Sequence, residues 1–570
     1  MGTTTGTSTN KRTSPAGADG PAGAAGAAGA ATPAGAVGQA PTLFTRKATG
    51  LVREGRTRDA LFYNVMWSSV ALTFAFYWLF LGSYGGSNAI LGILLAAAFG
   101  LPMAFLYAMF TQLMPRSGGD YVFNSRILHP AIGFAANFSF CLWVIVSSGI
   151  YTTYIADYGF GGFARTMAGF TGARGWLNFG HWFSTDWGLF LTGVAILLVS
   201  AGLFVAGGTH LFFRVQIWCF ALYILGAIGV PVIVGLLQSQ AGFVHNFNAY
   251  AANLGTPHAS AALVASAAKA GYHPTKFSLE ASVRSVSVFW FVYGFLFSST
   301  YFAGEIRLQR GTHLRSMPGA VAVAVITMLL LAVTFTHFAS YTFNGRLAVA
   351  DPAAYGFLAG APAYPEIVGI ASGSAVWGIL AIVGFTAGLF IWLPQTLMLV
   401  SRSMFAWSFD RVAPERLSSV EPRTRSPLLA VGIIMLLVIA STAVYSFTNW
   451  FTTLSVELGV SFTMVITAVA AIVLPFRHPE LVASSPYARR VVGVPLFVLV
   501  GALALLGFLC AMSILLWDPA SGVSLSKDPG KLPLAALVYL VGFGLYYAAR
   551  AFRRRQGVEL ELAYRELPPE

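Results

Sequence analysis

The stretch Leu428–Tyr445, LLAVGIIMLLVIASTAVY, runs for 18 residues without a charged side chain. At a helical rise of 1.5 Å per residue it is about 27 Å long, close to the roughly 30 Å thickness of a bilayer's hydrocarbon core. Of the 570 residues, 56% are hydrophobic and only 10% are charged, which leaves too little polar surface for water-soluble domains. The sequence therefore predicts a membrane protein.

Similar apolar stretches recur along the whole chain, and a transmembrane barrel would instead need short segments of alternating hydrophobicity. We predict an all-α polytopic membrane protein with about twelve spanning helices. The predicted spans are Val65–Gly82, Ala89–Phe110, Ala131–Tyr154, Leu189–Gly207, Val215–Leu237, Val286–Ala303, Ala320–Tyr341, Ala375–Val400, Leu428–Tyr445, Leu454–Leu474, Val491–Leu516 and Leu534–Phe552.

The distribution of basic residues predicts the orientation of these spans. With both termini on the same side, that side carries 26 of the 34 Lys and Arg residues. Cytoplasmic loops carry such an excess, so we expect both termini in the cytoplasm and the protein in the cell membrane. The net charge of +13 then reflects topology rather than nucleic-acid binding.

Several segments lie outside the spans. Residues 1–45 are rich in Gly, Ala, Thr, Ser and Pro, which predicts a disordered cytoplasmic tail, and residues 553–570 form a second cytoplasmic tail. Three outer segments are longer than a turn. They either cover a vestibule or are tolerated insertions. These segments are Gly159–Asp186, Gln238–Ser285 and Thr342–Ser374.

The composition also narrows the classes of function. No stretch outside the spans is long enough for a catalytic domain, and the sequence has no Gly-rich phosphate loop of an ATP-driven pump. The three cysteines, Cys141, Cys219 and Cys510, lie in predicted spans and suggest neither disulfides nor a metal site. We expect no catalytic residue, metal or cofactor.

Four motifs stand in order between the predicted spans. They read MPRSGGDYVFNSRILHP (residues 114–130), GTHLFFRVQ (208–216), FWFVYGFLFSSTYFAGEIR (289–307) and SRSMFAWSFDRVAPERL (401–417). Together they resemble the amino acid-polyamine-organocation (APC) permeases. The matching positions of the family's structural motifs are Gly118, Gly119, Tyr121, Gly304, Glu305, Arg402 and Asp410.

These motif residues also have a plain physical interpretation. Two adjacent glycines at 118 and 119 allow positive φ angles and a close backbone approach, which suits a tight turn between helices 2 and 3. Arg402 and Asp410 lie near Arg411 and Glu415, and we expect these four residues to form a charge cluster at the membrane interface. Such a cluster either anchors the loop or breaks and re-forms during transport.

The resemblance implies a ten-helix core over residues 60–475, made of two inverted five-helix repeats at about 60–237 and 286–475. Helices 1 and 6 would be interrupted near the membrane midplane, where substrate binds. Helices 11 and 12, residues 490–552, would lie outside this core. The implied activity is secondary transport of amino acids or related organic amines by alternating access, through proton symport or exchange.

Helix 6 provides one set of candidate substrate-binding residues. Gly294 lies in mid-span, where the lack of a Cβ favours unwinding, although a small residue at a helix crossing is the alternative. By its place in the family's helix 6, Trp290 resembles the aromatic residue that covers bound substrate, and it suits a cation–π contact with an ammonium group. Tyr293 and Ser298 flank the same position.

Helix 1 departs from the family pattern. The family's glycine-rich interruption corresponds to WSSVALTF at residues 67–74, which contains no glycine. Ser68 and Ser69 either open the helix, which leaves the backbone of Val70 and Ala71 free to bind substrate, or cap carbonyl groups of an intact helix. This departure puts recognition of an α-carboxylate in question.

Two acids are candidates for proton coupling. Glu457 lies inside the tenth predicted span, where a charge costs about 2.5–3.5 kcal/mol, and Asp157 follows the third span. Each could instead lie at the membrane interface. Tyr223 holds the position at which some family members have a coupling lysine in helix 5, and His337 is a further titratable group, more simply explained as structural.

Two other classes of function remain open. A channel or facilitative pore for small non-carboxylate solutes would need a continuous polar lining, whereas the spans carry scattered Ser, Thr and Asn. A membrane-embedded enzyme would need clustered acids and histidines. The expected partners are a small-molecule substrate, protons and the lipid bilayer, and no nucleic acid.

Overall fold

The computed structural model describes residues 55–307, 311–358, 360–448 and 453–564, and every structural statement below refers to these residues. The predicted tail at residues 1–45 lies outside them, as do residues 565–570. The described chain is helical almost throughout, apart from one small hairpin in which β1 (Arg490–Val491) pairs with β2 (Val494–Pro495). The predicted fold class, an all-α polytopic membrane protein, is confirmed.

The long helices begin at residues whose side chains or backbones favour a helix start. Asn88 and Thr185 accept hydrogen bonds from the backbone N–H groups of Leu91 and Gly188, which satisfies donors that a first helical turn leaves free. Pro130 occupies a first-turn position, where its missing N–H has no cost. These signals fix the starts of α3, α8 and α5.

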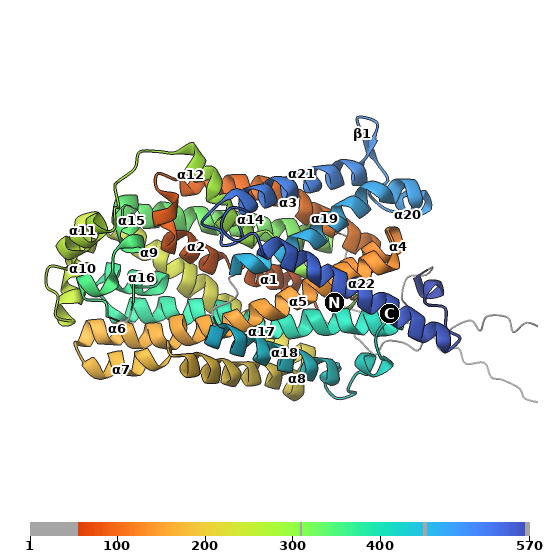
Figure 1. Ribbon diagram of the computed structural model, residues 1–570, viewed down its shortest axis with the longest axis horizontal. Helices are drawn as coiled ribbons and strands as arrows, with labels where there is room; N and C mark the ends of the chain where they lie inside the picture. The colour runs from red at the N-terminus through yellow and green to blue at the C-terminus, as the bar shows by residue number, and fades with distance from the viewer. Residues whose placement is uncertain (1–54, 308–310, 359, 449–452, 565–570) are drawn as a thin grey trace, which may run out of the picture. The chain divides into compact units, whose positions relative to one another are not determined.

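Most of the described chain lies in long helices that are roughly parallel or antiparallel (Figure 1). Some of these long segments consist of two consecutive helices, as in Thr57–Leu79, Pro130–Thr171 and Asp186–Leu237. The helices that build the long segments are α1 (Thr57–Trp67), α2 (Val70–Leu79), α3 (Ala89–Leu113), α5 (Pro130–Tyr154), α6 (Gly162–Thr171), α8 (Asp186–Leu222), α9 (Val230–Leu237), α14 (Thr312–Phe338), α17 (Ala375–Phe409), α18 (Leu428–Thr448), α19 (Thr453–Arg477), α21 (Leu496–Trp517) and α22 (Lys531–Arg555).

Shorter helices connect them. They are α4 (Asp120–Ile127), α7 (Arg174–Trp182), α10 (Gln240–Asn253), α11 (Ala259–Lys269), α12 (Leu279–Arg284), α13 (Val286–Phe289), α15 (Tyr341–Val349), α16 (Tyr364–Ser372) and α20 (Pro479–Ala483).

Ten helical segments of the described chain are long and apolar enough to cross a membrane, against about twelve predicted spans. The difference has two sources. The predicted fourth and fifth spans form one run, Asp186–Leu237, within which Gly208 alone is non-helical, at φ 57° and ψ −149°. The predicted sixth span is broken into short turns, so it contains no long helix.

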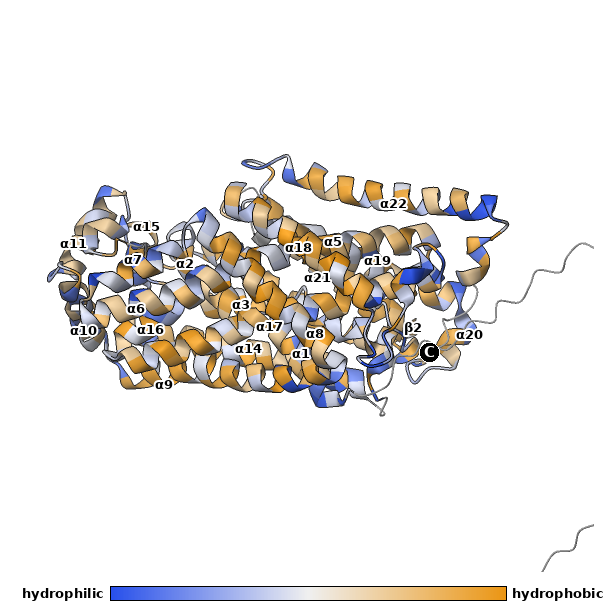
Figure 2. Ribbon diagram, turned by 90° about the horizontal axis from the view of Figure 1, so that it is seen from below, coloured by the Kyte–Doolittle hydropathy of each residue, from blue (hydrophilic) through white to orange (hydrophobic). Residues whose placement is uncertain are grey.

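The surface of these helices fits a lipid environment. Trp218 is 73% exposed and Leu237 is 82% exposed, which would be unfavourable in water for such large apolar side chains. Hydrophobic residues dominate the middle of the long helices, and hydrophilic residues gather towards their ends, including the arginines that end α22 (Figure 2). The last two helices pack on the outside of this arrangement, α21 against α3 and α19, and α22 against α5.

The bundle has two ends that matter for function. The helices α6, α7, α10, α11, α15 and α16 gather at one of them, on the left in Figure 1, and we call it the Arg165 end. The opposite end contains the Gly118–Tyr121 turn, Glu305 and Arg402, and we call it the Arg402 end. The three long outer segments predicted from the sequence thus contain helices that cover the Arg165 end.

Candidate functional site

Helix 1 is interrupted at its two serines. The helix α1 ends at Trp67, Ser69 adopts a left-handed conformation at φ 49° and ψ 47°, and α2 begins at Val70. A left-handed conformation costs a non-glycine residue about 1–2 kcal/mol. The phenol of Tyr151, from α5, donates a 2.7 Å hydrogen bond to Ser69 Oγ, and Ser68 Oγ donates to the carbonyl of Val65 at 2.7 Å. These hydroxyl contacts hold the interruption open without glycine.

Helix 6 is interrupted more widely. After α13 the chain forms a 3-10 turn at Trp290–Val292, an irregular segment at 293–297 and a second 3-10 turn at Ser298–Tyr301. We call the segment from Ser298 to Glu305 the arm of helix 6. Both predicted interruptions are therefore present.

The side chain of Asn64 joins the two interruptions. Its Nδ2 donates to Ser299 Oγ at 3.1 Å, and its Oδ1 accepts from the backbone N–H of Ser299 at 2.8 Å. One amide thus satisfies a backbone donor that the break in helix 6 leaves free. Sequence reasoning missed Asn64, although an amide one turn before the paired serines was a visible signal.

Five fully buried aromatic side chains pack together beside the interruptions, and we call them the aromatic cage. They are Trp67, Tyr151, Phe291, Phe295 and Trp392. Trp392, from the middle of α17, is the hub: its ring centroid lies 4.2 Å from Tyr151, 4.8 Å from Trp67 and 5.1 Å from Phe295. Four helices contribute to the cage, so its shape depends on how they are placed relative to one another.

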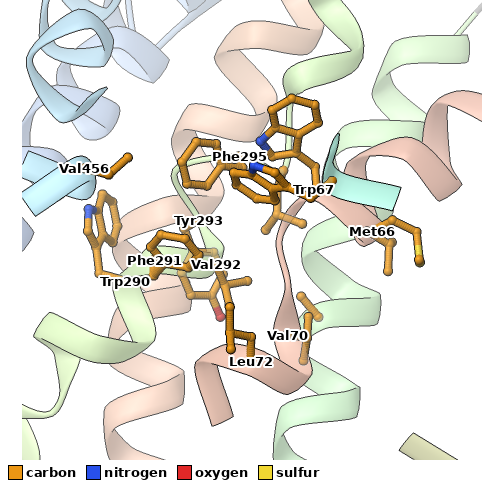
Figure 3. Close-up of a cluster of buried hydrophobic side chains, with 14 of the residues drawn as sticks. Met66, Trp67, Val70, Leu72, Trp290, Phe291, Val292, Tyr293, Phe295 and Val456 are labelled. Carbon is orange, nitrogen blue, oxygen red and sulfur yellow. The ribbon is translucent and has the colours of Figure 1, made fainter. Parts of the chain in front are cut away.

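The residues predicted on helix 6 are close to the cage but do not all face it. Trp290 packs edge-on against Phe508 of α21 at 4.5 Å, and Figure 3 shows it beside Val456, on the far side of Phe295 from Trp67. Phe291, the next residue, is the one stacked near Trp392, at 6.3 Å.

The other two predicted side chains of helix 6 have local contacts. Tyr293 lies against Gly100 of α3. A Cβ placed on Gly100 would lie 2.5 Å from the Cβ of Tyr293. Ser298 Oγ donates to the carbonyl of Phe295 at 2.9 Å. Both side chains are buried, and the Ser298 contact stabilises the turn at the start of the arm.

The start of α2, where Val70 and Ala71 were predicted to face substrate, already has a partner. The backbone N–H of Ala71 donates a 2.8 Å hydrogen bond to the hydroxyl of Tyr223. Tyr223 holds the helix 5 position at which some relatives have a lysine. In this state the Tyr223 hydroxyl accepts the hydrogen bond of the Ala71 N–H, which is one of the backbone donors that a substrate carboxylate at the start of α2 would use.

Glu457 of α19 reaches the break in helix 6. A Cβ placed on Gly294 would lie 2.7 Å from Glu457 Oε1 and 3.0 Å from Oε2, so the carboxyl packs directly on the glycine backbone. Ser461 Oγ is 3.5 Å from Oε1, and within the described residues Oε2 has no hydrogen-bond partner. Glu457 is fully buried, which excludes an interfacial position with access to water in this state.

Comparison with known proteins agrees with this geometry. A family model described as amino acid permease matches residues 60–543, which is most of the chain. The chain belongs to the amino acid permease family. This places it in the APC superfamily and confirms the resemblance carried by the four motifs. A search of curated proteins finds no significant match.

The second predicted coupling residue of the permease, Asp157, lies at the Arg165 end, apart from the cage. Its carboxylate pairs with Arg165 at 2.9 Å and accepts a hydrogen bond from Ser184 at 2.8 Å, and Arg165 also pairs with Glu366 at 2.7 Å. Asp157 and Arg165 line a cavity of about 260 Å³, together with aromatic residues such as Phe76.

His337, the other titratable candidate, contacts the carbonyl of Gly235 at 3.0 Å, which is a structural role.

At the Arg402 end, the glycine pair of the permease has the positive φ angles expected of it, but its contacts are with the arm of helix 6 and α17. Gly118 and Gly119 have φ angles of 106° and 56°. A Cβ on Gly118 would lie 2.6 Å from that of Ala406, and one on Gly119 would lie 2.8 Å from the ring of Tyr301. The backbone N–H of Gly118 donates to the carbonyl of Tyr301 at 2.9 Å, so this turn docks the arm of helix 6.

The charges near Arg402 are arranged differently from the predicted cluster. Arg402 forms a two-pronged ion pair with Glu305, at 2.6 and 2.9 Å, and both side chains are buried. Gly304 is part of the turn that presents Glu305. Asp410 pairs instead with Arg126 of α4 at 2.7 Å and accepts from Tyr121 at 2.8 Å. Arg402 and Asp410 are thus bound to distant helices and not to each other, because eight residues along a helix separate them by about 12 Å.

Proposed function

We propose that this permease is a secondary transporter that binds an amino acid or a related organic amine between interrupted helices 1 and 6 and moves it by alternating access. The observation that carries the proposal is that both interruptions meet, through Asn64 and Ser299, beside one aromatic cage. Interrupted helices in the core of a bundle are typical of substrate sites in secondary transporters, because they leave backbone groups free for a ligand.

The aromatic cage supports an ammonium group as the recognised part of the substrate. The faces of Trp67, Tyr151 and Trp392 attract a cation through their negative quadrupole, and a desolvated contact of this kind contributes about 2 kcal/mol or more. The cage is closed and filled by its own side chains in this state, so substrate entry requires Trp392 or Phe295 to rotate. Phe291 and Phe295 are better placed than Trp290 to cover the substrate.

The start of α2 supports an amine over an ordinary α-amino acid within this substrate class. A carboxylate would have to displace the Tyr223 hydroxyl from the N–H of Ala71 and compete with Tyr151 for Ser69. An amine without a carboxylate leaves both contacts in place.

We further propose that Glu457 carries the coupled proton. A buried carboxylate with no cation beside it is unfavourable unless it is protonated or a cationic ligand approaches. Because Glu457 packs on Gly294, movement of helix 6 changes its surroundings directly. Protonation would therefore be linked to the same rearrangement that exposes the substrate. Exchange without a proton remains the alternative mechanism.

The orientation follows from the basic residues. We place the permease in the cell membrane with the Arg402 end and both termini at the cytoplasmic side, since this end carries the predicted excess of Lys and Arg. The Arg165 end then faces outward, and the cavity beside Asp157 would be an entry vestibule.

Ligand-dependent stability of the purified permease tests the proposal. A panel of amino acids, polyamines and other small amines is added at two pH values, and the melting temperature Tm is measured. A ligand present at 100 times its Kd stabilises the folded state by about 2.7 kcal/mol, which is a clear rise in Tm. We expect amines to raise Tm more than amino acids, and a panel without any effect would contradict the proposed substrate class.

Two tryptophans of α17 provide a matched pair of variants. Trp392→Leu changes the hub of the cage and should abolish the ligand-dependent rise in Tm. Trp377→Leu changes a partly exposed residue of the same helix and should preserve it. Trp290→Ala tests the covering role predicted from the sequence. If only Trp290→Ala removed the effect, the cage would not be the substrate site.

A further inference from the structure

Buried acids in this permease fall into two groups. Seven Asp or Glu side chains are buried in the described part of the chain, and five of them have an arginine within 4 Å. The five are Asp59, Glu305, Glu366, Asp410 and Asp518. The other two are Glu457, discussed above, and Asp120, for which the described residues provide no ion pair with Lys, Arg or His. Asp120 is therefore the second acid whose charge no nearby cation balances.

Asp120 is held by three neutral donors from three parts of the fold. Its Oδ2 accepts from the hydroxyl of Tyr301 at 2.8 Å and from that of Tyr107 at 3.3 Å, and its Oδ1 accepts from Asn137 Nδ2 at 2.8 Å. Tyr107 belongs to α3, Asn137 to α5 and Tyr301 to the arm of helix 6. Asp120 opens α4 directly after the glycine pair, and it is fully buried. One carboxyl thus joins the arm to two helices of the other half of the core.

The remaining neighbours of Asp120 carry no compensating charge. Cys141 of α5 and Tyr539 of α22 are close enough to interact with it electrostatically, and α19 approaches through Thr467, whose hydroxyl lies 3.3 Å from that of Tyr107. The charged pair formed by Arg126 and Asp410 is near the other end of α4.

Burial therefore dominates the titration of this carboxyl. Desolvation raises the pKa of Asp120 to about 6, and the hydrogen bonds from Tyr301, Asn137 and Tyr107 oppose that rise. Both protonation states are thus accessible near neutral pH while the arm is docked. An exposed aspartate has a pKa of about 3.9, so the same group would lose its proton if it became hydrated.

The arm of helix 6 contributes the shortest hydroxyl contact of Asp120. Besides the Tyr301 contact, the arm is docked by Gly118, whose N–H donates to Tyr301 O, and by Thr300, whose hydroxyl lies 2.7 Å from that of Thr111. If the arm moves away from the glycine turn, Asp120 loses its shortest hydroxyl donor and gains water.

We propose that Asp120 is a proton-binding site that binds a proton more tightly while the arm of helix 6 is docked and releases it to water at the Arg402 end when the arm moves away. The step is a simple transfer between a carboxylic acid and water, with no other reactant. Movement of the arm rests on the proposed alternating-access function, whereas proton binding in the docked state does not. Protonation favours the docked state, so lower pH stabilises docking and higher pH weakens it.

Infrared titration of the purified permease in lipid tests the proton site without any substrate. The stretching band of protonated carboxyl groups is followed from pH 4 to pH 8. We expect a component with a midpoint near pH 6, lost in Asp120→Asn and retained in Glu457→Gln. A titration that Asp120→Asn leaves unchanged would overturn the proposal, whatever the result of the ligand panel.

Tyr301→Phe provides a second, milder variant in case Asp120→Asn does not fold. It removes a donor that favours the carboxylate, so the midpoint should move to higher pH. An unchanged midpoint in a folded Tyr301→Phe protein would contradict the assignment.

Cysteine labelling tests the link to the arm. Thr300→Cys is introduced after Cys141, Cys219 and Cys510 are replaced by alanine, and its labelling rate is compared with and without Asp120→Asn at each pH. At pH 8 the chain with Asp120 should label faster than the Asp120→Asn chain, by up to about 100-fold for two pKa units. The two rates should converge at pH 4. A ratio that does not change with pH would show that Asp120 is not coupled to the arm.

Discussion

Gly294 shows how one residue without a side chain brings two elements into contact. Its backbone lies directly against the carboxyl of Glu457, at a point where helix 6 has no regular hydrogen bonding. A β-carbon has no room there unless Glu457 turns away. The glycine therefore sets the distance between a buried acid and the interrupted helix.

Gly294→Ala should consequently impair transport and lower the free energy of unfolding by about 1–3 kcal/mol, the usual cost of overpacking. Uptake in proteoliposomes and Tm report the two effects. Gly432→Ala is the matched control, because a Cβ at Gly432 of α18 would meet nothing within 4 Å. Equal behaviour of the two variants would show that the contact with Glu457 has no consequence.

Glu457→Gln keeps the size of the side chain and removes its charge. If Glu457 carries the coupled proton, the variant should lose pH-driven accumulation while it retains exchange of substrate across the membrane. Its Tm should be unchanged or raised, because a buried group with no ion-pair partner no longer has to be neutralised. Pronounced pH-driven accumulation in the variant would assign the proton to another group.

Among the elements, the arm of helix 6 has the contacts that best suit repeated docking on α17 and on the Gly118 turn. The ion pair between Arg402 and Glu305 fixes its far end to α17, and the Gly118 turn fixes its middle. Thr209 adds a hydroxyl 3.0 Å from Arg402 Nη2. The arm is thus held by polar contacts that can break in water, which suits an element that moves.

Arg402→Ala leaves Glu305 buried without a partner, and we expect it to destabilise the permease by about 3–5 kcal/mol. Arg416→Ala, on an exposed residue of the following loop, should stay within about 0.5 kcal/mol of the parent. Combining Arg402→Ala with Glu305→Ala should recover part of the loss, as thermal melts would show. Additive losses would mean that the pair is not coupled.

The sequence predicted the membrane spans and tight turns better than the side-chain contacts between them, because spans and turns have local patterns and the contacts do not. Apolar length identifies a span without reference to the rest of the chain, and the glycine pair at 118 and 119 indicates a tight turn by itself. The pair between Arg402 and Glu305 joins residues 97 positions apart, which no local pattern shows. The sequence indicated Trp290, whereas Phe291 is the residue stacked near Trp392. Neighbouring residues of a 3-10 turn face directions about 120° apart, and position in a motif does not determine which one faces the aromatic cage.

At the scale of the whole molecule, the two ends of the bundle contain similar groups of buried or half-buried ion pairs. Arg402 and Glu305 form one group, and Arg165 with Glu366 and Asp157 forms the other. Under the alternating access proposed above, the two groups of ion pairs would open in turn. The two ion-pair groups should therefore bias the conformational equilibrium in opposite directions.

Hydrogen exchange measured by mass spectrometry checks this expectation. Arg402→Lys should speed exchange in the Gly118–Tyr121 turn and in the arm of helix 6, and leave α16 unchanged. Glu366→Gln should speed exchange in α16 and α6 and leave the Arg402 end unchanged. Faster exchange at both ends in either variant would indicate general destabilisation rather than a shift between two states.

The contact between Tyr121 and Tyr564 has a consequence for biosynthesis. Their hydroxyls lie 2.9 Å apart across 443 residues of sequence, and Arg126 lies over the ring of Tyr564 at 4.8 Å. At roughly 5–20 residues per second, a ribosome needs about 20–90 s to travel from one tyrosine to the other. During that time Tyr121 and Arg126 wait in the membrane without this partner, so the Arg402 end is completed only after translation has reached Tyr564.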